Sequence, residues 1–481
     1  MEQFDLVVLG AGPAGIAAAI RAHDLGRSVL VIERDKLGGA GIHNGALSSK
    51  TLWELAKDYA TACRVDRGYR AENVTLSYAA VTATVRAAEG ERRQLFEREF
   101  AGLAVHGPGK LAVRAGTGRF VSPTVVRITA ADGSTADVTA SFFLVATGSR
   151  PRALPGIVAD GVRVLTSDHL EALPEFPESL VVIGAGVVGC EYATIFSRFG
   201  RTKVHLLDRE ARILPFEDED VSEVIEASFR EMGLTLHHHT RLASLSPRAD
   251  GVTVNLIGPS GPTVLEASHV LLSVGRVPNT DDLGLAEAGV QLTPGGVIVA
   301  EDTRTSVPHI YGAGDTTADI AVANVAELEG RHAVERMFGL DPKPLSYGAL
   351  SSILFLAPEV ASVGMNEQQA KAAGVPYRVA VVHNALVARN VAMRATRGFV
   401  KLLARPDGRL IGIRVVGPQA SSTIQGVALL IDRGGTVEDL VHCFHPHPSI
   451  PEGVQECARL LLGRSLYKPE IHPGALRLAS G

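Results

Sequence analysis

A glycine-rich turn near the N-terminus carries the first recognisable chemistry of the sequence. The turn Gly10-Ala-Gly12-Pro-Ala-Gly15 follows the apolar run Phe4–Leu9 and precedes a helix expected over Ile16–Leu25. The first glycine permits a tight turn, the second lets the backbone approach a pyrophosphate, and the third lets the helix pack closely on the strand. The helix N-terminus adds free N–H groups and a partial positive charge. Glu33 closes the next apolar run, Ser28–Ile32, where a carboxylate would accept from a ribose hydroxyl, so the segment predicts a dinucleotide site.

The same pattern returns in the middle of the chain. Residues 180–207 again predict a strand, a turn (Gly184-Ala-Gly186-Val-Val-Gly189), a helix and a strand, and Asp208 closes them. Two copies imply two bound dinucleotides. Asp208 would accept from a free 2′-hydroxyl and repel a 2′-phosphate, which favours NADH over NADPH. Arg209 and Arg212 are close enough in sequence to offset that preference, so NADPH stays open.

Residues 38–50 stand between these two patterns and read Gly-Gly-Ala-Gly-Ile-His-Asn-Gly-Ala-Leu-Ser-Ser-Lys. With the first dinucleotide fold before it, this stretch resembles the flavin-dependent pyridine nucleotide–disulfide oxidoreductases, where it has the form Gly-Gly-x-Cys-x-x-x-Gly-Cys-x-Pro-Ser-Lys. The chain has Gly41 and Ala46 at the positions of the two redox cysteines, and Ser48 at the position of the proline. The resemblance therefore implies the scaffold of a flavin pocket without the usual redox disulfide.

Three further segments carry the same resemblance. Phe142–Pro151 predicts a buried strand that ends in the Thr147-Gly148 turn, and Val270–Val274 predicts another that ends at Gly275-Arg276. Residues 309–317 contain Asp315, at the position where the family's carboxylate binds the ribityl chain of FAD. A helix is expected after it, at about Ala321–Met337. The resemblance implies FAD and NAD(P)H as cofactors. The residues expected to bind them are Gly10, Gly12, Ala14, Gly15, Glu33, Gly39, Ala40, Lys50, Gly116, Thr147, Gly148, Asp315, Gly184, Gly186, Gly189, Asp208, Arg209, Gly275 and Arg276.

Lys50 ends the stretch that follows the first dinucleotide fold, and Glu191 comes shortly after the second glycine turn. In the family the corresponding pair sits beside the reactive nitrogen of the flavin, where the nicotinamide stacks. The resemblance implies that Lys50 favours the reduced flavin and that Glu191 holds the lysine. The alternative is an exposed lysine and a glutamate on a helix surface.

His447 and Glu452 are the candidate acid–base pair near the C-terminus. The segment His-Pro-His447-Pro448-Ser-Ile-Pro-Glu452 resembles the family's His-Pro-x-x-x-Glu element, whose histidine serves the redox thiols across the dimer. A histidine oriented by a carboxylate suits proton transfer near neutral pH. Without thiols the pair either protonates another acceptor or is a structural remnant. His445 and Cys443 are weaker candidates of the same segment.

His43 is a further candidate catalytic residue. It stands in the redox stretch, where soluble transhydrogenases also have a histidine, and Gly41 and Ala46 leave space beside it. A flat acceptor could stack there, with His43 or His447 supplying a proton. The alternative is a surface histidine in a glycine-rich loop.

The order of these motifs predicts an α/β protein. It has two Rossmann-like domains, for FAD and for NAD(P), and a C-terminal α+β interface domain. We expect residues 1–150 and 281–345 to form the FAD domain, 151–280 the NAD(P) domain and 346–481 the interface domain, through which family members dimerise. A helix is predicted over 49–62, and the charged segment from about 85 to 104 is interpreted as a solvated helix.

The charge, the cysteine spacing and the length of the apolar runs argue against several classes of function. The 481 residues are 46% hydrophobic and carry a net charge of -5, so nothing favours nucleic acid as a partner. The four cysteines form no CxxC pair or metal-ligand spacing, and no metal is expected. No apolar run approaches the ~18 residues of a membrane helix, so we expect a cytoplasmic protein.

Three functions remain open. The first is an NAD(P)H oxidoreductase that passes electrons from flavin directly to a small acceptor, a quinone; the run Ile213-Leu-Pro-Phe-Glu-Asp resembles actinobacterial quinone reductases of the family. The second is a soluble transhydrogenase, which the run Gly184–Phe196 also resembles. The third is a protein that binds FAD and NADH without turnover, against which Lys50, Glu191 and the His447–Glu452 pair argue.

Overall fold

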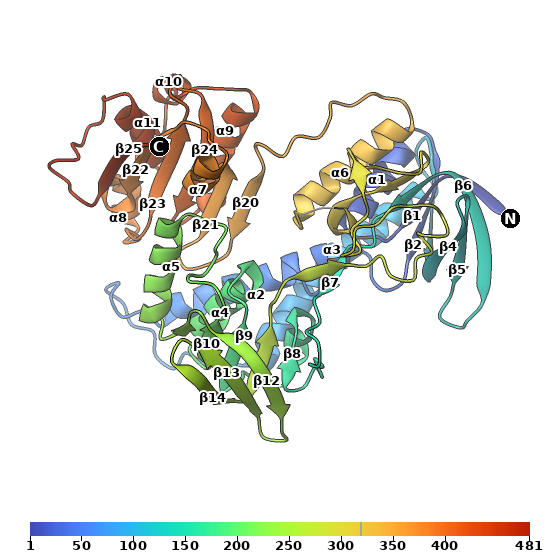
Figure 1. The fold of residues 1–481 in the computed structure, drawn as a ribbon, viewed down its shortest axis with the longest axis horizontal. Coiled ribbons are helices and arrows are strands. Elements are labelled where there is room, and N and C mark those ends of the chain that lie inside the picture. The colour runs from blue at the N-terminus through green and yellow to red at the C-terminus, as the bar shows by residue number, and fades with distance from the viewer. Residues whose placement is uncertain (318–319) are drawn as a thin grey trace. The chain divides into compact units, whose positions relative to one another are not determined.

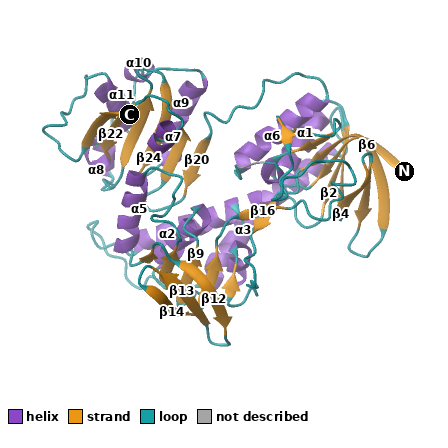
Figure 2. Cartoon of the chain, viewed as in Figure 1, coloured by secondary structure: helices purple, strands orange, loops and turns teal. Residues whose placement is uncertain are grey.

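The computed structural model describes residues 1–317 and 320–481. These residues form two compact units, each built from two separate stretches of chain. The first unit comprises Met1–Phe176 and Leu272–Leu345, and the second Pro177–Leu271 and Ser346–Gly481. Figure 1 follows the chain by colour and Figure 2 shows the helices and strands of each unit.

A nine-stranded sheet forms the centre of the first unit. Its main path runs β17-β18-β19-β6-β1-β2-β3, and the β4–β5 hairpin joins it at β6. Leu6 of β1 is paired in parallel with Val29 of β2 and with Phe142 of β6. The strands are β1 Glu2–Leu9, β2 Ser28–Glu33, β3 Lys110–Ala115, β4 Thr117–Ser122, β5 Val125–Thr129, β6 Thr135–Val145, β17 Ala300–Glu301, β18 Arg304–Thr305 and β19 Ile310–Gly312. Short strands outside this sheet are β7 Ser149–Pro151, β8 Val164–Leu165 and β16 Arg276–Pro278.

The helices of the first unit lie against this sheet or against one another. They are α1 Pro13–Asp24, α2 Ala46–Ala62, α3 Tyr78–Leu103 and α6 Ala323–Met337, with 3-10 turns η1 Gly39–Gly41, η2 Ser167–Ala172 and η3 Gly314–Thr316. α1 and α6 lie side by side (Figure 1), and a Cβ added at Gly330 of α6 would lie 2.2 Å from the carbonyl oxygen of Ala14. The glycine therefore permits this close packing.

Helix starts were predicted a few residues too late. α1 begins at Pro13, whose fixed φ suits the first helical position. α2 begins at Ala46, because the Ser48 hydroxyl accepts the Gly45 backbone N–H at 3.0 Å and so supports an earlier first turn.

The interpretation of the charged helix as solvated is wrong along one face. α3 begins at Tyr78 and buries Val81, Val85 and Glu89, which recur every fourth residue and so lie on one side of the helix. Glu89 is only 8% exposed. Because many residues of the segment are charged, the sequence did not reveal this buried face.

The first stretch of the second unit repeats the dinucleotide fold. β9, β10 and β11 pair in parallel in the order β11-β10-β9, with β15 next to β9, and a separate antiparallel sheet has the order β12-β13-β14. The elements are β9 Ser179–Ile183, α4 Val187–Phe199, β10 Lys203–Leu207, α5 Glu219–Glu231, β11 Thr235–His237, β12 Arg241–Pro247, β13 Val252–Gly258, β14 Gly261–Ala267 and β15 His269–Leu272.

The second stretch of this unit is an antiparallel sheet with helices. Its order is β20-β21-β24-β23-β22-β25. The strands are β20 Ser351–Leu354, β21 Val360–Gly364, β22 Arg378–His383, β23 Phe399–Ala404, β24 Leu410–Val416 and β25 Leu476–Ser480. The helical elements are α7 Glu367–Ala372, η4 Asn384–Leu386, α8 Ala388–Ala392, α9 Ala420–Asp432, α10 Val437–His442 and α11 Glu452–Leu461.

Buried ion pairs join the two stretches of the second unit. Lys401 of β23 is fully buried, and its Nζ lies 2.9, 2.6 and 3.2 Å from carboxylate oxygens of Asp218, Asp220 and Glu367. Arg414 of β24 is also buried, and its Nε lies 2.9 Å from Glu217. Because these acids flank the start of α5 and of α7, the pairs fix both helices against the sheet.

No helix within residues 1–317 and 320–481 is long and apolar enough to cross a membrane.

Candidate active site

The first glycine turn has the backbone geometry of a pyrophosphate cradle. Gly10 has a φ of 101°, and a Cβ there would lie 2.4 Å from the carbonyl oxygen of Ala146. A Cβ at Gly15 would lie 1.9 Å from the carbonyl oxygen of Gly10, so the turn and α1 are in close contact. A Cβ at Gly12 would meet no atom within 4 Å. Gly10 and Gly15 thus serve packing, whereas Gly12 leaves space open above the start of α1.

Glu33 is held at the rim of this turn. Its Oε2 accepts the Ala11 backbone N–H at 2.7 Å and its Oε1 accepts that of Asp35 at 2.8 Å. The carboxylate belongs to a cavity of about 360 Å³ in the first unit. The predicted residues Gly10, Gly116 and Thr147 line the same cavity, as do Asn279 and Asp281, which the sequence did not single out. Asn279 is tied to Thr147, whose hydroxyl donates to the Asn279 carbonyl at 2.6 Å.

The redox stretch lies directly beside the first turn. A Cβ at Gly39 would lie 3.1 Å from Cα of Gly12, so these two predicted binding segments touch. Ala40 stands between Gly39 and Gly41 in η1, and a Cβ at Gly45 would lie 1.9 Å from the Ala40 carbonyl oxygen. The loop is therefore tightly folded, and its glycines cannot carry side chains without movement.

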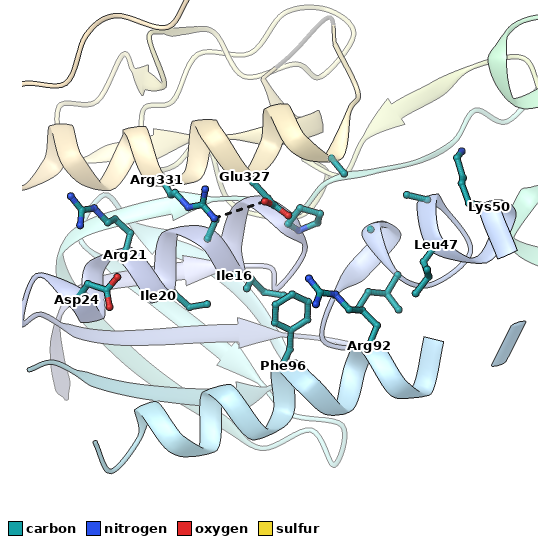
Figure 3. A pocket seen from close by; sticks show the side chains of 17 residues that line it. Ile16, Ile20, Arg21, Asp24, Leu47, Lys50, Arg92, Phe96, Glu327 and Arg331 are labelled. Atoms are coloured by element: carbon teal, nitrogen blue, oxygen red, sulfur yellow. Dashed lines mark ion pairs between the residues drawn. The ribbon is translucent and has the colours of Figure 1, made fainter. Parts of the chain in front are cut away.

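A second cavity, of about 480 Å³, opens in the first unit where the redox cysteines would stand (Figure 3). Gly41, Ala46 and Lys50 line it together, so the structure brings three positions of the redox stretch to one wall. Ile42 of the loop and Leu47 of α2 add apolar surface beside them. The remaining walls come from α1, α3 and α6, and each of these helices contributes apolar and charged side chains; they include Ile16, Ile20, Arg21, Asp24, Arg92, Phe96, Ala323, Glu327 and Arg331. The guanidinium of Arg92 lies 4.5 Å from the centre of the Phe96 ring.

Asp315 joins a polar network of the first unit. Its Oδ2 accepts the Ser149 hydroxyl at 2.5 Å, and Ser149 Oγ accepts from Nε of Arg276 at 2.7 Å. The sequence placed Gly275 and Arg276 at the exit of the nicotinamide domain, and the structure assigns both to the first unit. Gly148, next to Ser149, has a φ of 69° and accepts the Asn279 N–H at 2.8 Å. Arg276 is thereby positioned next to a predicted flavin-binding carboxylate.

The second glycine turn repeats the first in detail. Gly184 has a φ of 101°, a Cβ at Gly186 would meet nothing within 4 Å, and Gly189 is buried in α4. Asp208 Oδ2 accepts the Ala185 N–H at 2.6 Å and Oδ1 accepts that of Glu210 at 2.9 Å. The acid therefore has the same backbone partners, relative to its turn, as Glu33.

Arg212 is occupied by other partners. Its guanidinium donates to the Glu217 carbonyl at 2.7 Å, the Ser222 hydroxyl at 2.9 Å and the Gln368 side chain at 2.9 Å. Arg209 is exposed and pairs with Glu210 at 3.2 Å. Of these two arginines, Arg209 is the one left to meet a 2′-phosphate.

Lys50 lies in the first unit and Glu191 in the second. Lys50 Nζ donates to Ser49 Oγ at 3.3 Å. Glu191 is 5% exposed, and its Oε1 accepts the Phe355 N–H at 3.0 Å. Glu191 is thus a buried residue of α4 rather than a surface one, and its pairing with Lys50 stays a prediction.

His447 and Glu452 are in direct contact. His447 Nδ1 lies 2.7 Å from Glu452 Oε1, and Glu452 Oε2 accepts the Ser449 N–H at 2.7 Å. Burial raises the pKa of Glu452, but the Ser449 and His447 hydrogen bonds lower it more, so the net shift is downward. The imidazole is 71% exposed. The dyad can hold and orient a proton at an accessible ring nitrogen. His445, by contrast, makes a local contact to the Cys443 carbonyl.

His43 is nearly buried rather than exposed on the loop. Its Nδ1 lies 3.5 Å from Oε2 of Glu89 on α3. Sequence reasoning missed Glu89, for which the four-residue spacing of the buried stripe in α3 was the available signal.

Comparison with known proteins identifies the class that this fold and site define. Residues 4–330 match the family model "Pyridine nucleotide-disulphide oxidoreductase", and residues 350–458 match the dimerisation domain of that family. The chain belongs to the pyridine nucleotide–disulfide oxidoreductase family. It is 36% identical to a dihydrolipoyl dehydrogenase of Geobacillus stearothermophilus over 470 residues, 96% of this chain and 97% of that protein.

Two further relatives extend the comparison. A mercuric reductase of Streptomyces lividans is 34% identical over 460 residues, 95% of this chain and 96% of that protein. A crystal structure of LpdA from Mycobacterium tuberculosis is similar with a TM-score of 0.87 and 32% identity, over 96% of this chain and all of that one. The predicted family and the α/β fold, with FAD- and NAD-binding Rossmann-like domains and a dimerisation domain, are confirmed.

The cofactors of the family, FAD and NAD(P)H, fit the residues present. The open space at Gly12, the contact of Gly39 with Gly12 and the cavity around Glu33 suit an extended dinucleotide in the first unit. Gly186 and Asp208 provide the equivalent turn and acid in the second. The chain is an enzyme of the flavoprotein disulfide oxidoreductase class, and most of the similar proteins are dihydrolipoyl dehydrogenases.

Proposed function

We propose that the protein passes electrons from NAD(P)H through FAD directly to a small acceptor, a quinone, without a redox disulfide. The observation that carries this proposal is the 480 Å³ cavity lined by Gly41, Ala46 and Lys50. The cysteines of the chain offer no substitute pair in this wall. Cys190 and Cys457 are buried in the second unit, and Cys63 and Cys443 are exposed free thiols that are not among the cavity's lining residues.

The chain's own residues would bind and orient the partners. Gly10, Gly12 and Glu33 would hold the FAD dinucleotide, and Gly186 and Asp208 the nicotinamide dinucleotide. When bound, FAD would supply the two-electron chemistry that connects a reduced nicotinamide with an acceptor. The apolar wall of the cavity would exclude water from that acceptor. His447, oriented by Glu452, would hold a proton; in the dimer that we propose, this loop serves the partner's site.

Flat aromatic acceptors suit the cavity best. The apolar side chains of α1 and the Phe96 ring offer flat contact surfaces, and the Arg92 guanidinium caps Phe96 (Figure 3). An aromatic pair contributes ~0.5–1.5 kcal/mol beyond area burial. A quinone ring could therefore stack here, with its oxygens near Lys50 or Arg92.

Phe96→Ala is expected to raise the KM for menadione about tenfold, the equivalent of ~1.4 kcal/mol, while the rate of flavin reduction by NADH stays unchanged. The matched control is Leu95→Ala, because Leu95 is exposed and does not line the cavity. Steady-state kinetics with varied menadione checks the result. If Phe96→Ala leaves the KM for menadione unchanged, the acceptor does not bind in this cavity.

Transhydrogenation is the second candidate, because Arg209 stays available beside Asp208 for a 2′-phosphate. Initial rates with NADH and either menadione, thio-NADP⁺ or lipoamide separate the alternatives. Turnover with menadione alone supports the quinone proposal, and turnover with thio-NADP⁺ supports the transhydrogenase. Turnover with lipoamide would overturn both. If no acceptor is reduced and neither NADH nor NADPH bleaches the flavin, the protein is a binding protein.

Restoring the two cysteines is not expected to restore disulfide chemistry. A Cβ at position 41 would lie 2.7 Å from Cγ of Pro13, so Gly41→Cys/Ala46→Cys has to displace α1 or the loop. We expect no lipoamide activity above that of the single variant Ala46→Cys. Thiol counting under denaturing conditions, with and without reductant, shows whether the bridge forms. Full lipoamide activity in the double variant would show that the cavity has not diverged from the family.

The domain roles follow from the same proposal. We propose residues 1–150 and 281–345 as the FAD-binding parts, 151–280 as the NAD(P)-binding part and 346–481 as the interface part of a homodimer. The match of residues 350–458 to the family's dimerisation domain supports the dimer.

A further inference from the structure

His43 and Glu89 form a nearly buried pair inside the first unit. His43 follows η1 in the redox stretch, and Glu89 lies on the buried side of α3. The ring Nδ1 and the carboxylate Oε2 are 3.5 Å apart, and the two side chains are 11% and 10% exposed. The pair is therefore an imidazole and a carboxylate held together almost out of solvent.

The polar atoms of this pair are largely without hydrogen bonds. Within the described residues, neither ring nitrogen of His43 nor Oε1 of Glu89 has a hydrogen-bond partner. Burying such groups costs free energy unless they are compensated by charge or by a bridging water. Native proteins keep few such groups, and those that persist often have a functional reason. The contact between the imidazole and the carboxylate provides that compensation when the imidazole carries a proton.

Other titratable groups face the pair from neighbouring elements. Burial raises the pKa of Glu171 of η2, and the charge of Glu89 raises it further, while a hydrogen bond from Ser48 opposes the shift. Arg86 of α3 and Lys36 add positive charge, and Arg86 donates to the Glu171 carbonyl at 3.3 Å. Two carboxylates close together repel when both are charged. In this cluster Glu171 is therefore the carboxyl group whose protonated form is favoured.

The pair adjoins, along the chain, residues that line the proposed acceptor cavity. Ile42, which lines the cavity, directly precedes His43 in the loop. Arg92 and Phe96, which also line it, follow Glu89 by three and seven residues and so share its face of α3. His43 and Glu89 do not themselves line the cavity, so the loop and α3 connect the pair to it.

We propose that His43 supplies the proton taken up when the acceptor is reduced, and that Glu89 is its positioning residue. This inference rests on the proposed quinone reduction. In that reaction NADH, one proton and the quinone give NAD⁺ and the hydroquinone. NADH provides two electrons and one proton as a hydride. The His43 imidazolium provides the second proton, through a bridging water or a rotation of the ring, and bulk water reprotonates it.

The test compares two acceptors on the FAD-loaded His43→Gln variant. Menadione takes up protons with its electrons, whereas ferricyanide takes up electrons alone. We expect menadione turnover to fall about 100-fold, the lower range of general-acid catalysis, and ferricyanide turnover to stay within about twofold. His106→Gln, an exposed histidine of the same unit, is the matched control. Equal losses with both acceptors, or no loss with either, would overturn the inference.

Glu89→Gln tests the positioning role with the same two acceptors. Menadione turnover should fall and ferricyanide turnover should stay within about twofold, and Glu89→Asp should restore part of the menadione rate because it keeps a carboxylate on α3. A menadione rate that Glu89→Gln leaves unchanged would contradict the positioning role of Glu89. If the wild type reduces no quinone, the proposed function fails; if it does and His43→Gln loses nothing, only this inference fails.

Discussion

Gly15→Ala is expected to destroy both FAD binding and the packing of the first unit, whereas Gly12→Ala should remove FAD binding alone. A Cβ at Gly15 would lie 1.9 Å from the Gly10 carbonyl oxygen, a backbone atom that cannot rotate away. A Cβ at Gly12 would meet no protein atom within 4 Å, but it would occupy the space where a pyrophosphate approaches the helix N-terminus. The two glycines therefore have separable roles.

Two measurements separate these roles. Urea unfolding of the apoproteins should show a loss of at least ~1–3 kcal/mol for Gly15→Ala, the range of overpacked sites, and little change for Gly12→Ala. FAD titration should show weak or no binding for both. Gly90→Ala is the matched control, because Gly90 lies in α3 with no atom within 4 Å of an added Cβ, and alanine favours helix. Normal FAD binding by Gly12→Ala would contradict the assignment of the first turn.

Lys401→Met is expected to destabilise the second unit by about 3–5 kcal/mol, the range for removing one partner of a buried ion pair. Lys401 is fully buried, and its loss removes the cation that Asp218, Asp220 and Glu367 share, while Arg477 stays with Asp220 and Glu367 only. Thermal and urea unfolding of the apoprotein check the result. Arg433→Met is the control, because the exposed Arg433 pairs only loosely with Asp432 at 3.8 Å and should be neutral.

The same cluster predicts the direction of the pH dependence. Burial raises the pKa of Glu367, but the Arg477 hydrogen bond and the charge of Lys401 lower it more, so its folded pKa is below the ordinary value. A group whose folded pKa is lowered stabilises the fold above its unfolded pKa, and that stability is lost as pH falls through the folded pKa. Stability of the wild type should therefore fall in the acid range below the ordinary glutamate pKa.

The two variants decide whether the cluster stabilises the second unit. If Lys401→Met loses no more stability than Arg433→Met, the cluster does not have this role.

Local patterns in the sequence predicted those parts of the site in which all the contacting residues belong to one motif. A strand, a glycine turn, a helix and an acid at the next strand end were sufficient to place Glu33 and Asp208. In both copies the structure gives the acid the same backbone contacts. The resemblance of the segment around His447 and Glu452 to the family's His-Pro-x-x-x-Glu element predicted a dyad, and the structure brings the two side chains to 2.7 Å. In each case the residues in contact belong to one motif of the sequence.

The features that the sequence did not predict depend on tertiary contacts. Glu89 was hidden in a highly charged helix, and only the packing of α3 buries it against His43. Arg212 was a candidate for a 2′-phosphate, but Gln368, distant in sequence, holds its guanidinium. The C-terminal strand β25 pairs with β22 across about a hundred residues, and its five-residue apolar alternation is too short to predict. The spacing of the buried stripe in α3 shows which face of the helix Glu89 lies on, but no sequence pattern identifies the distant partners in these contacts.

Anaerobic reduction of the flavin shows whether electrons reach the acceptor without a disulfide. The exposed thiols Cys63 and Cys443 are first alkylated, and the FAD-loaded protein is then titrated with NADH and mixed with menadione. We expect one NADH per FAD to bleach the flavin completely, because no disulfide accepts a second pair of electrons, and menadione to restore the colour rapidly. A requirement for two NADH per FAD, or a loss of menadione reoxidation on alkylation, would show instead that thiols carry the electrons.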